Sequence, residues 1–514
     1  FGLTILGQTQ SPPDPWTLWF ATPAAHFTES CPVGNGRLGA MCFGGVAHER
    51  IVLNEITLWS GSVHEQDREG AHEHRPTILA LLRAGKNLEA ERLVDQVFTC
   101  DGPGSSHGNA KEGPFGCYQT LGDLRLDLVD GEGKPIEGEV GGYRRELELD
   151  GALARVRYAQ GGVEYSRELI ASRPDGVLVL RLTANVAGHV SFDARLARAE
   201  RGEVERTGEH GLVLTGRLAN GLGKDGLAFV ARLAAVPSGG RLWSSESGLH
   251  VRAADEALLL VSAATDYSGP IAGQFAGKEY LTTTRSQLDA AARKPWPELR
   301  AAQEADHRAL FERVQLDLGP PIDQPTPERL AAFSRGAKDS QLAALYFQFG
   351  RYLLISSSRP GSLPANLQGL WAEEYQTPWN SDYHIDVNVQ MNYWPAEVTN
   401  LAECQLPLTA LVESLVEPGR RTARAYYGAD GWIAHVITNV WGFTAPGESA
   451  SWGASNCGAG WLCAHLFEHY AFSRDRVYLA RVYPVLESSA EFYLDTLIEE
   501  PSERHLVTAI STSP

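Results

Sequence analysis

Carboxylates, amides, an imidazole and indoles are concentrated in the segment 378–394. Such groups donate and accept hydrogen bonds to hydroxyls, and indole offers a flat face to C–H groups, which is typical of sites for neutral polyols. Phosphate would instead favour Lys and Arg, which this segment lacks. A buried hydrogen-bond network that holds a loop between helices is the alternative interpretation. The residues concerned are Trp379, Asp382, His384, Asp386, Asn388, Gln390, Asn392 and Trp394.

Asp386 and Asn388 place a carboxylate and an amide close together in this segment. They are two residues apart, so on an extended segment both side chains would point the same way. An amide and an indole recur at Asn439 and Trp441, and a further amide, Asn366, lies in the stretch 363–371. For these loops, a purely structural role is the alternative.

Two other patterns resemble functional motifs less well. His465 and His469 are four residues apart, as in some metal sites, but the segment is not HExxH and helix packing is the preferred interpretation. The glycine-rich stretch 34–45 has no Walker-type Lys and predicts a tight pair of strands. No GxSxG nucleophile motif stands out, so acid–base hydrolysis of a glycoside is the favoured chemistry, with no metal and no cofactor.

The composition restricts the partners. The chain has 514 residues and a formal net charge of −18, which repels nucleic acids and anionic membranes. No run of 18 apolar residues predicts membrane insertion. Cys100 and Cys117 either close a disulfide in an oxidising compartment or are free buried thiols. The segment 1–7 resembles the end of a secretory signal, which favours a secreted or periplasmic protein, although ordinary sequence is the alternative.

Hydrophobic periodicity predicts strands first and helices second. From 16 to 280 the period is mostly two, which predicts an antiparallel β-sandwich, with a helical interruption over 76–97. Helices are expected over 290–314, broken near Pro295 and Pro297, and over 342–353, 408–427, 459–472 and 476–497. We therefore predict three parts: a β-sandwich domain (16–280), a helical linker (281–327) that ends in a Pro-rich stretch, and a helical domain (328–514).

Four longer motifs, in order along the chain, resemble glycoside hydrolase family 95. They are PVGNGRLGAM at 32–41, LNEITLWSG at 53–61, YQTLGDL at 118–124 and VNVQMNYWPAE at 387–397. The resemblance implies inverting α-L-fucosidases, notably for 1,2-linked fucose, and some α-L-galactosidases. It also implies an N-terminal β-sandwich, a helical linker, an (α/α)6 barrel and a small C-terminal β domain. Of the barrel, we expect this chain to hold the N-terminal half.

The resemblance also assigns the site. The family holds its attacking water with an Asn-x-Asn motif; here Asn388 matches the second amide, and Asp386 replaces the first. Asp386 is either the general base itself or a substitute for an amide that another carboxylate activates. His384 matches the position that faces the C5 substituent of the sugar. The family's general acid is a Glu expected immediately after Pro514. Asn366, Asn439 and Trp441 are expected to bind substrate.

Three functions follow as alternatives. The first is an inverting exo-α-L-fucosidase acting on fucosylated oligosaccharides or glycans. The second is an α-L-galactosidase of the same architecture, because L-galactose differs from L-fucose by one hydroxyl. The third is a sugar-binding fragment that is catalytically incomplete. The oligomeric state is not predicted.

Overall fold

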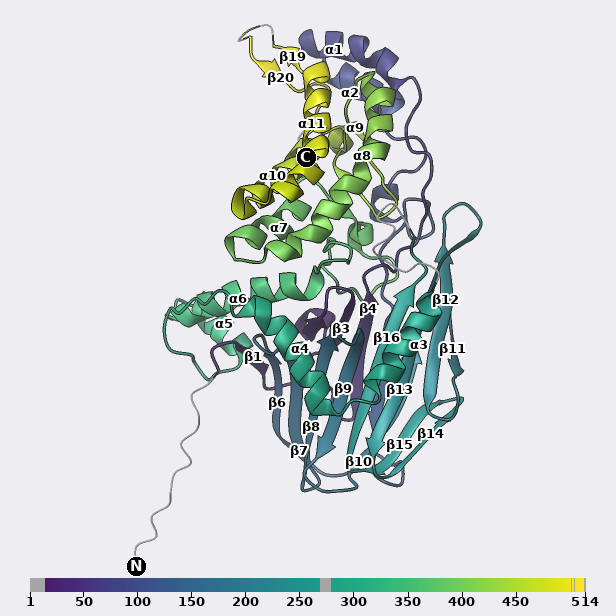
Figure 1. Cartoon of the computed structure of the whole chain (residues 1–514), viewed down its shortest axis with the longest axis vertical. Helices are drawn as coiled ribbons and strands as arrows, with labels where there is room; N and C mark the ends of the chain where they lie inside the picture. The colour runs from purple at the N-terminus through teal and green to yellow at the C-terminus, as the bar shows by residue number, and fades with distance from the viewer. Residues whose placement is uncertain (1–13, 269–278, 501, 503, 513–514) are drawn as a thin grey trace, which may run out of the picture.

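The computed structural model describes residues 14–268, 279–500, 502 and 504–512. Two antiparallel sheets form the lower part of the molecule, and helices form the upper part (Figure 1). The segment 1–7, on which the secretory prediction rests, lies outside the described residues.

The larger sheet has nine strands, and each pairs antiparallel with its neighbours. Alternating side chains from both sheets form the main core, as an antiparallel sandwich requires. In spatial order the nine strands are β1 (Thr17–Phe20), β6 (Val140–Glu148), β7 (Leu153–Gln160), β8 (Val163–Ser172), β9 (Val177–Ala184), β16 (Glu256–Thr265), β13 (Asp225–Ser238), β12 (Gly211–Ala219) and β11 (Gly202–Arg206).

The smaller sheet packs against the larger one, and its strands are antiparallel too. Its seven strands, in spatial order, are β14 (Arg241–Ser245), β15 (Gly248–Ala254), β10 (Val190–Ala197), β5 (Gly122–Leu128), β4 (His48–Glu55), β3 (Leu38–Cys42) and β2 (Cys31–Gly34). The β-sandwich predicted from period-two alternation is confirmed.

Two helices cover the outer face of the nine-stranded sheet (Figure 1). These are α3 (Tyr280–Ala291) and α4 (Trp296–Phe311), and the break expected near Pro295 separates them. Trp296 and Leu299 pack on Val177, Val179 and Leu260. This contact explains why β9 and β16 are apolar without alternation, since both faces of these strands are buried.

The glycine-rich stretch 34–45 forms the predicted tight pair of strands, β2 and β3. A Cβ on Gly34 would lie 2.5 Å from the carbonyl oxygen of Ser356, at the end of a helix above the sandwich. Gly36 has φ +85°, and a Cβ there would lie 2.5 Å from the Arg359 side chain. Glycine therefore allows this strand turn to approach the helical region closely.

The helical region contains seven helices among the described residues. Four of them agree with the predicted helices within a few residues. Asp339 and Asp475 cap the helices that begin at Ser340 and Arg476. They accept hydrogen bonds from Leu342 N (3.0 Å) and Val477 N (2.8 Å), respectively. The helices are α5 (Thr326–Ser334), α6 (Ser340–Ser357), α7 (Asn388–Val398), α8 (Leu406–Tyr427), α9 (Ala450–Gly453), α10 (Gly458–Ser473) and α11 (Arg476–Thr496). A short hairpin of β19 (Ile498–Glu499) and β20 (Leu506–Val507) follows.

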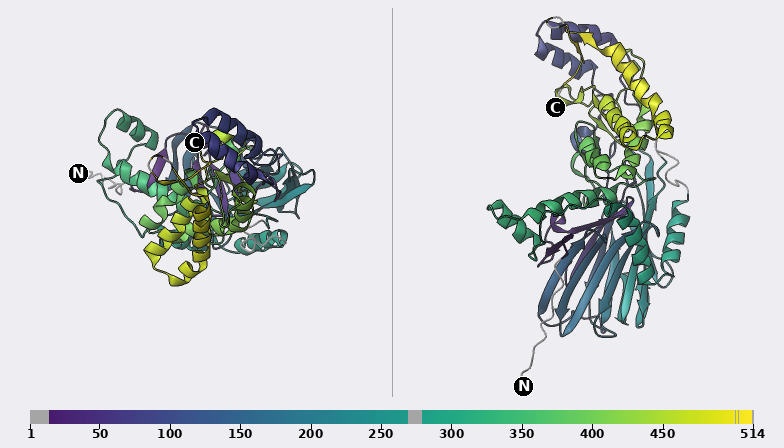
Figure 2. Two further views of the ribbon diagram at one scale, coloured as in Figure 1. Left: turned by 90° about the horizontal axis from the view of Figure 1, so that it is seen from above. Right: turned by 60° about the vertical axis from the view of Figure 1, so that its left-hand side comes forward.

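The predicted helical interruption is confirmed as α1 (Arg75–Arg83) and α2 (Asn87–Val97), but it packs away from the sandwich. Both helices lie at the top of the molecule against the helical region (Figures 1 and 2). Asp95 accepts a hydrogen bond from Ala450 N (2.7 Å), and Arg75 donates one to the Thr496 carbonyl (2.7 Å). A segment from the N-terminal half thus stabilises the helical region. The domain boundaries at 280 and 327 stay predictions.

Candidate active site

Two distant polar loops, both noted in the sequence, meet through a two-residue ladder. Strand β17 (Tyr383–His384) pairs antiparallel with β18 (Ile437–Thr438), and Ile385 N donates to the Val436 carbonyl at 2.7 Å. Tyr383 is buried and stacks on Trp59, whose ring centre lies 5.8 Å away. The β-sandwich segment around Trp59 therefore supports the strand that presents His384.

The chain enters β17 through three successive left-handed residues, Trp379, Asn380 and Ser381 (φ 48°, 58° and 52°). Each such L-residue costs roughly 1–2 kcal/mol, so surrounding contacts must hold the conformation. The buried Asn380 amide supplies them: it donates to Ser105 O (2.9 Å) and accepts from Ala110 N (2.7 Å). The Trp379 side chain, by contrast, is 64% exposed.

Asp382 and His384 form a hydrogen-bonded ion pair beneath this turn. Asp382 is 1% exposed, and burial raises the pKa of its carboxyl to about 6, although the hydrogen bond to His384 opposes the rise. Burial alone would lower the pKa of His384, but its hydrogen bond to Asp382 and the negative charges of Asp382 and Asp386 raise it. The i, i+2 spacing on a strand could have revealed this pair in the sequence.

Asp386 lines a pocket of about 400 Å³. The pocket lies between the turn after β17, the start of α10 and the segment 511–512, and Trp461 contributes an indole to it. A carboxylate beside an indole in a cavity of this size suits a monosaccharide, whose hydroxyls and C–H face they would contact. The remaining lining residues are Ile385, His435, Ser455, Cys457, Gly458, Ser511 and Thr512.

Asn388 does not share an extended segment with Asp386, so that expectation is wrong. Asp386 lies in a turn, and the exposed Asn388 is the first residue of α7. The helical period of Val389, Tyr393 and Ala396, all buried, is the signal that predicts α7. The surrounding polar residues obscured it. The catalytic roles of Asp386 and Asn388 stay predictions.

The other predicted substrate-binding residues lie in the protein interior. Asn439 is 1% exposed; its amide donates to Phe115 O (2.7 Å) and its side-chain oxygen accepts from the backbone N–H groups of Trp441 (2.9 Å) and Phe443 (3.2 Å). Trp441 donates through Nε1 to the Ser60 carbonyl (2.7 Å). None of these side chains is among those that line the pocket with Asp386.

Asn366 is also buried, at 1% exposed. Its side-chain oxygen accepts from Gln368 N (2.8 Å), and its backbone carbonyl accepts from the Asn392 side chain (3.4 Å). Its amide nitrogen has no hydrogen-bond partner among the described residues. Substrate binding by Asn366, Asn439 and Trp441 stays a prediction.

The structure bears on two alternatives from the sequence: metal binding or helix packing for His465 and His469, and a disulfide or free thiols for Cys100 and Cys117. His469 is buried and hydrogen-bonds Glu397 of α7 (2.6 Å), which agrees with helix packing. Within the described ranges, no group of His, Cys, Asp and Glu side chains is arranged to hold a metal ion. Cys100 and Cys117 are free buried thiols, not a disulfide. In the part of the chain that the structure describes, no helix is long and apolar enough to cross a membrane.

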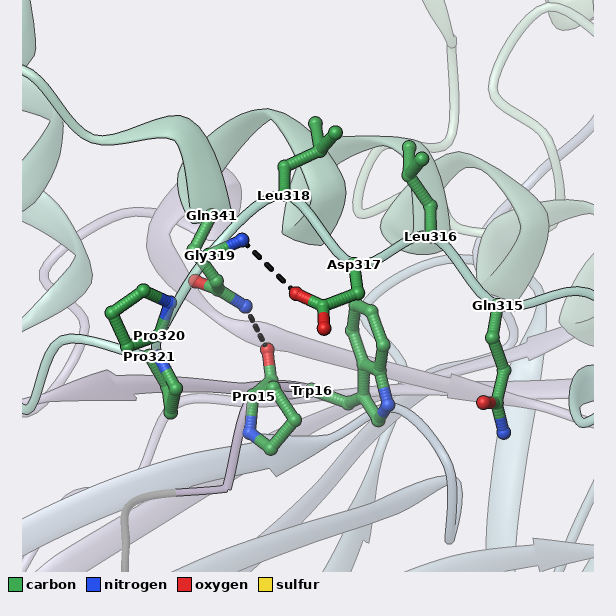
Figure 3. A pocket seen from close by; sticks show the side chains of 10 residues that line it. All are labelled: Pro15, Trp16, Gln315, Leu316, Asp317, Leu318, Gly319, Pro320, Pro321 and Gln341. Carbon is green, nitrogen blue, oxygen red and sulfur yellow. Dashed lines mark hydrogen bonds between the residues drawn. The ribbon is translucent and has the colours of Figure 1, made fainter.

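A larger pocket of about 530 Å³ lies where the segment 315–321 crosses Pro15 and Trp16 (Figure 3). Asp317 is the single carboxylate among its lining residues and accepts from Gly319 N at 3.0 Å. Gln341 donates to the Pro15 carbonyl at 2.6 Å. The first bond lies within the segment 315–321 and the second joins α6 to the residues before β1, so the pocket is best explained as a junction between chain segments.

Comparisons with known proteins match both the β-sandwich part and the helical part of the chain to glycosyl hydrolase domains. Residues 295–514 match the glycosyl hydrolase family 95 catalytic domain, and residues 18–270 match the glycosyl hydrolase family 65 N-terminal domain. The chain is 35% identical over 530 aligned residues to alpha-L-fucosidase 2 of Arabidopsis thaliana, covering 97% of this chain and 61% of the relative. It is 32% identical to the probable alpha-fucosidase A of Aspergillus niger, covering 94% of this chain and 61% of the relative.

The fold has a counterpart among solved structures. A putative kojibiose phosphorylase from the human microbiome superposes with a TM-score of 0.62 at 10% identity, covering 98% of this chain and 62% of that one. At this identity the likeness concerns the fold alone. The chain thus spans about three fifths of the length of the relatives it matches. The match of residues 295–514 assigns this part of the chain to the catalytic domain of glycoside hydrolase family 95, and the two relatives resemble the chain over nearly its whole length.

Proposed function

We propose that the full-length protein is an inverting exo-α-L-fucosidase that uses the pocket at Asp386. The observation that carries the proposal is the placement of a carboxylate and an indole, Asp386 and Trp461, in one monosaccharide-sized pocket within the part of the chain that matches the family's catalytic domain. The names of both relatives support fucose as the sugar. The helical region would then be half of an (α/α)6 barrel, with the pocket at its opening.

In the proposed reaction, Asp386 takes a proton from a water molecule while that water attacks the anomeric carbon. A general acid on the opposite face of the sugar protonates the departing oxygen, and the product has inverted configuration. Inverting enzymes hold the two carboxyl groups about 6.5–9.5 Å apart, which leaves room for the water. The family resemblance assigns the acid to a Glu after Pro514.

His384 is proposed to distinguish L-fucose from L-galactose. It is half-buried, and Asp382 engages its Nδ1, so Nε2 is the ring nitrogen that can face a ligand. His384 is two residues from Asp386 but is not itself among the residues that line the pocket. An imidazole brought beside the C5 methyl of fucose would leave little room for an additional hydroxyl. Discrimination of a single group by such a pocket is about 10–100-fold.

The test is product analysis with the full-length protein and an α-1,2-linked fucosyl disaccharide. We expect release of L-fucose, with the β-anomer detected first by proton NMR, and a higher kcat/KM for the fucoside than for the matched L-galactoside. First appearance of the α-anomer would contradict inversion. A higher kcat/KM for the galactoside would favour the galactosidase alternative, and sugar binding in calorimetry without product would favour a binding protein. Fucosylated glycans as natural partners, and export from the cell, stay predictions.

A further inference from the structure

A second chemically suggestive cluster lies in the β-sandwich, at the β14–β15 hairpin. The Ser245 hydroxyl lies 2.7 Å from His250 Nε2, and His250 Nδ1 lies 2.6 Å from Asp193 Oδ1. Asp193 belongs to β10 and is opposite His250 of β15 in the ladder, while Ser245 ends β14. Strand pairing thus brings together three residues that show no motif in the sequence.

The proton positions in this cluster follow from its chemistry. An ionised carboxylate accepts hydrogen bonds and cannot donate them, so the Nδ1 that faces Asp193 carries the ring proton. In the neutral ring, Nε2 then has a lone pair, and the Ser245 hydroxyl must donate to it. This is the arrangement in which a histidine can remove the proton from a serine nucleophile.

Two neighbours hold the imidazole and the carboxylate in place. The Trp243 ring stacks on His250 with centres 5.0 Å apart and an interplanar angle of 23°. Arg252 donates to Asp193 Oδ1 (2.6 Å) and to the Phe192 carbonyl (2.9 Å), which fixes the carboxylate. The His250 side chain is only 12% exposed. The histidine therefore has little freedom to turn away from Ser245.

A pocket of about 360 Å³ opens beside the serine. Val204 and Leu212 give it apolar lining. Its charged lining residues are of both signs: Arg195, Glu205, Arg206 and Glu246. The Ser247 N–H donates to Ser245 Oγ at 3.1 Å, and the Ser247 hydroxyl lies 2.7 Å from the same oxygen, so Ser247 helps to fix the position of the serine oxygen. The size and lining suit a short acyl group better than a peptide or a long acyl chain.

We propose that Ser245 is the nucleophile of a second hydrolytic site, specific for short acyl esters and separate from the pocket at Asp386. Ser245 Oγ attacks the ester carbonyl carbon while its proton passes to His250 Nε2. The bond between that carbon and the alcohol oxygen then breaks, and the alcohol leaves with the proton from His250. Water attacks the acyl-serine, gives a proton to His250, and releases the carboxylic acid. The final proton transfer from His250 restores the serine. Figure 1 shows β14 and β15 in the sandwich, far from α10.

The first test uses p-nitrophenyl acetate with the full chain. We expect Ser245→Ala and His250→Ala each to lower the rate by about 10³-fold, and Asp193→Asn by about 10²-fold or more. Ser244→Ala is the matched control, since it removes a hydroxyl of the same hairpin that donates to the Gly208 carbonyl (3.3 Å) and does not line the pocket, and it should stay within about threefold of wild type. Equal loss in Ser245→Ala and Ser244→Ala, or no loss in Ser245→Ala, would overturn the proposal.

The second test does not depend on an alanine variant that folds. A fluorophosphonate probe should label Ser245 in the wild-type chain, as located by peptide mapping, and prior treatment with the probe should abolish acetate release. In addition, the thiol of Ser245→Cys should react with iodoacetamide at least about tenfold faster than that of Ser244→Cys, because His250 raises the thiolate fraction of the thiol at position 245. Labelling elsewhere in the chain, or equal thiol rates, would overturn the proposal.

Discussion

The loops 379–388 and 435–443 have similar compositions, but their polar side chains have different surroundings. Each combines an indole and a histidine with side-chain amides: two amides in the first loop and one in the second. In the second loop Asn439 uses its side chain in three hydrogen bonds and Trp441 donates to Ser60. In the first loop Trp379 is mostly exposed and Asp386 faces a pocket. Polar groups whose hydrogen-bonding capacity is used internally stabilise the fold, whereas groups that face a cavity are available to a ligand.

The largest effect is expected at Asp386. If this carboxylate is the base, Asp386→Asn should lower kcat of the full-length protein by about 10²–10⁴-fold with an unchanged unfolding midpoint. The measurement is steady-state release of L-fucose. If Asp386 only replaces the family's first amide, the same change recreates Asn-x-Asn, and kcat is retained or rises. The control is Asp430→Asn, which makes the same isosteric change at an exposed position that does not line the pocket.

In the second loop we expect a loss of stability instead. Asn439→Ala removes three hydrogen bonds and leaves buried backbone groups unsatisfied, so the free energy of unfolding should fall by about 2–4 kcal/mol. Urea unfolding followed by circular dichroism measures the change. Asn388→Ala, an exposed amide, should change it by less than about 0.5 kcal/mol. A raised KM at unchanged stability would instead support substrate binding by Asn439.

The Asp382–His384 pair predicts a pH dependence. The pKa of Asp382 is raised from 3.8 to about 6 in the folded protein, so Asp382 holds its proton more tightly there than in the unfolded chain. Its stabilising contribution is complete below about pH 4 and is lost as the pH rises through about 6. Between pH 4.5 and 7.5, wild type should therefore lose about 2 kcal/mol relative to Asp382→Asn, as measured by urea unfolding at each pH. Parallel pH curves for the two proteins would contradict this assignment.

Asp382→Asn should also change the titration of His384. The variant removes the hydrogen-bonded carboxylate that raises the pKa of the imidazole, while burial remains. NMR titration of His384 should therefore move to lower pH. An unchanged midpoint would show that Asp386 alone sets the charge of the imidazole.

The smallest effect is expected at Trp379. Glycine adopts a left-handed conformation without the steric cost of an L-residue, so Trp379→Gly should raise the free energy of unfolding by up to about 1 kcal/mol. Trp394→Gly is the matched control, because this partly exposed indole lies within α7. There glycine should lower stability by about 1 kcal/mol. A loss of stability in both variants would show that packing of the Trp379 ring outweighs its backbone strain.

The sequence by itself determined the local elements of this protein. Alternation of apolar residues predicts the strands, Pro295 separates α3 from α4, and the period of 342–353 predicts α6, because side-chain direction depends on local backbone geometry. The resemblance to glycoside hydrolase family 95 also followed from the motifs along the chain, and the catalytic-domain match over 295–514 agrees with it. The helix α7 was missed because its polar face concealed three buried residues.

Only the tertiary structure decided which polar residues form internal hydrogen bonds and which face a cavity. The pairing of β17 with β18 places Asp386 beside Trp461 and withdraws Asn439 into the interior. Likewise, neighbouring strands bring Asp193, Ser245 and His250 within hydrogen-bond distance. The physical reason is that a hydrogen bond joins groups that are close in space, and composition or spacing along a single segment does not specify which distant segment will lie beside it.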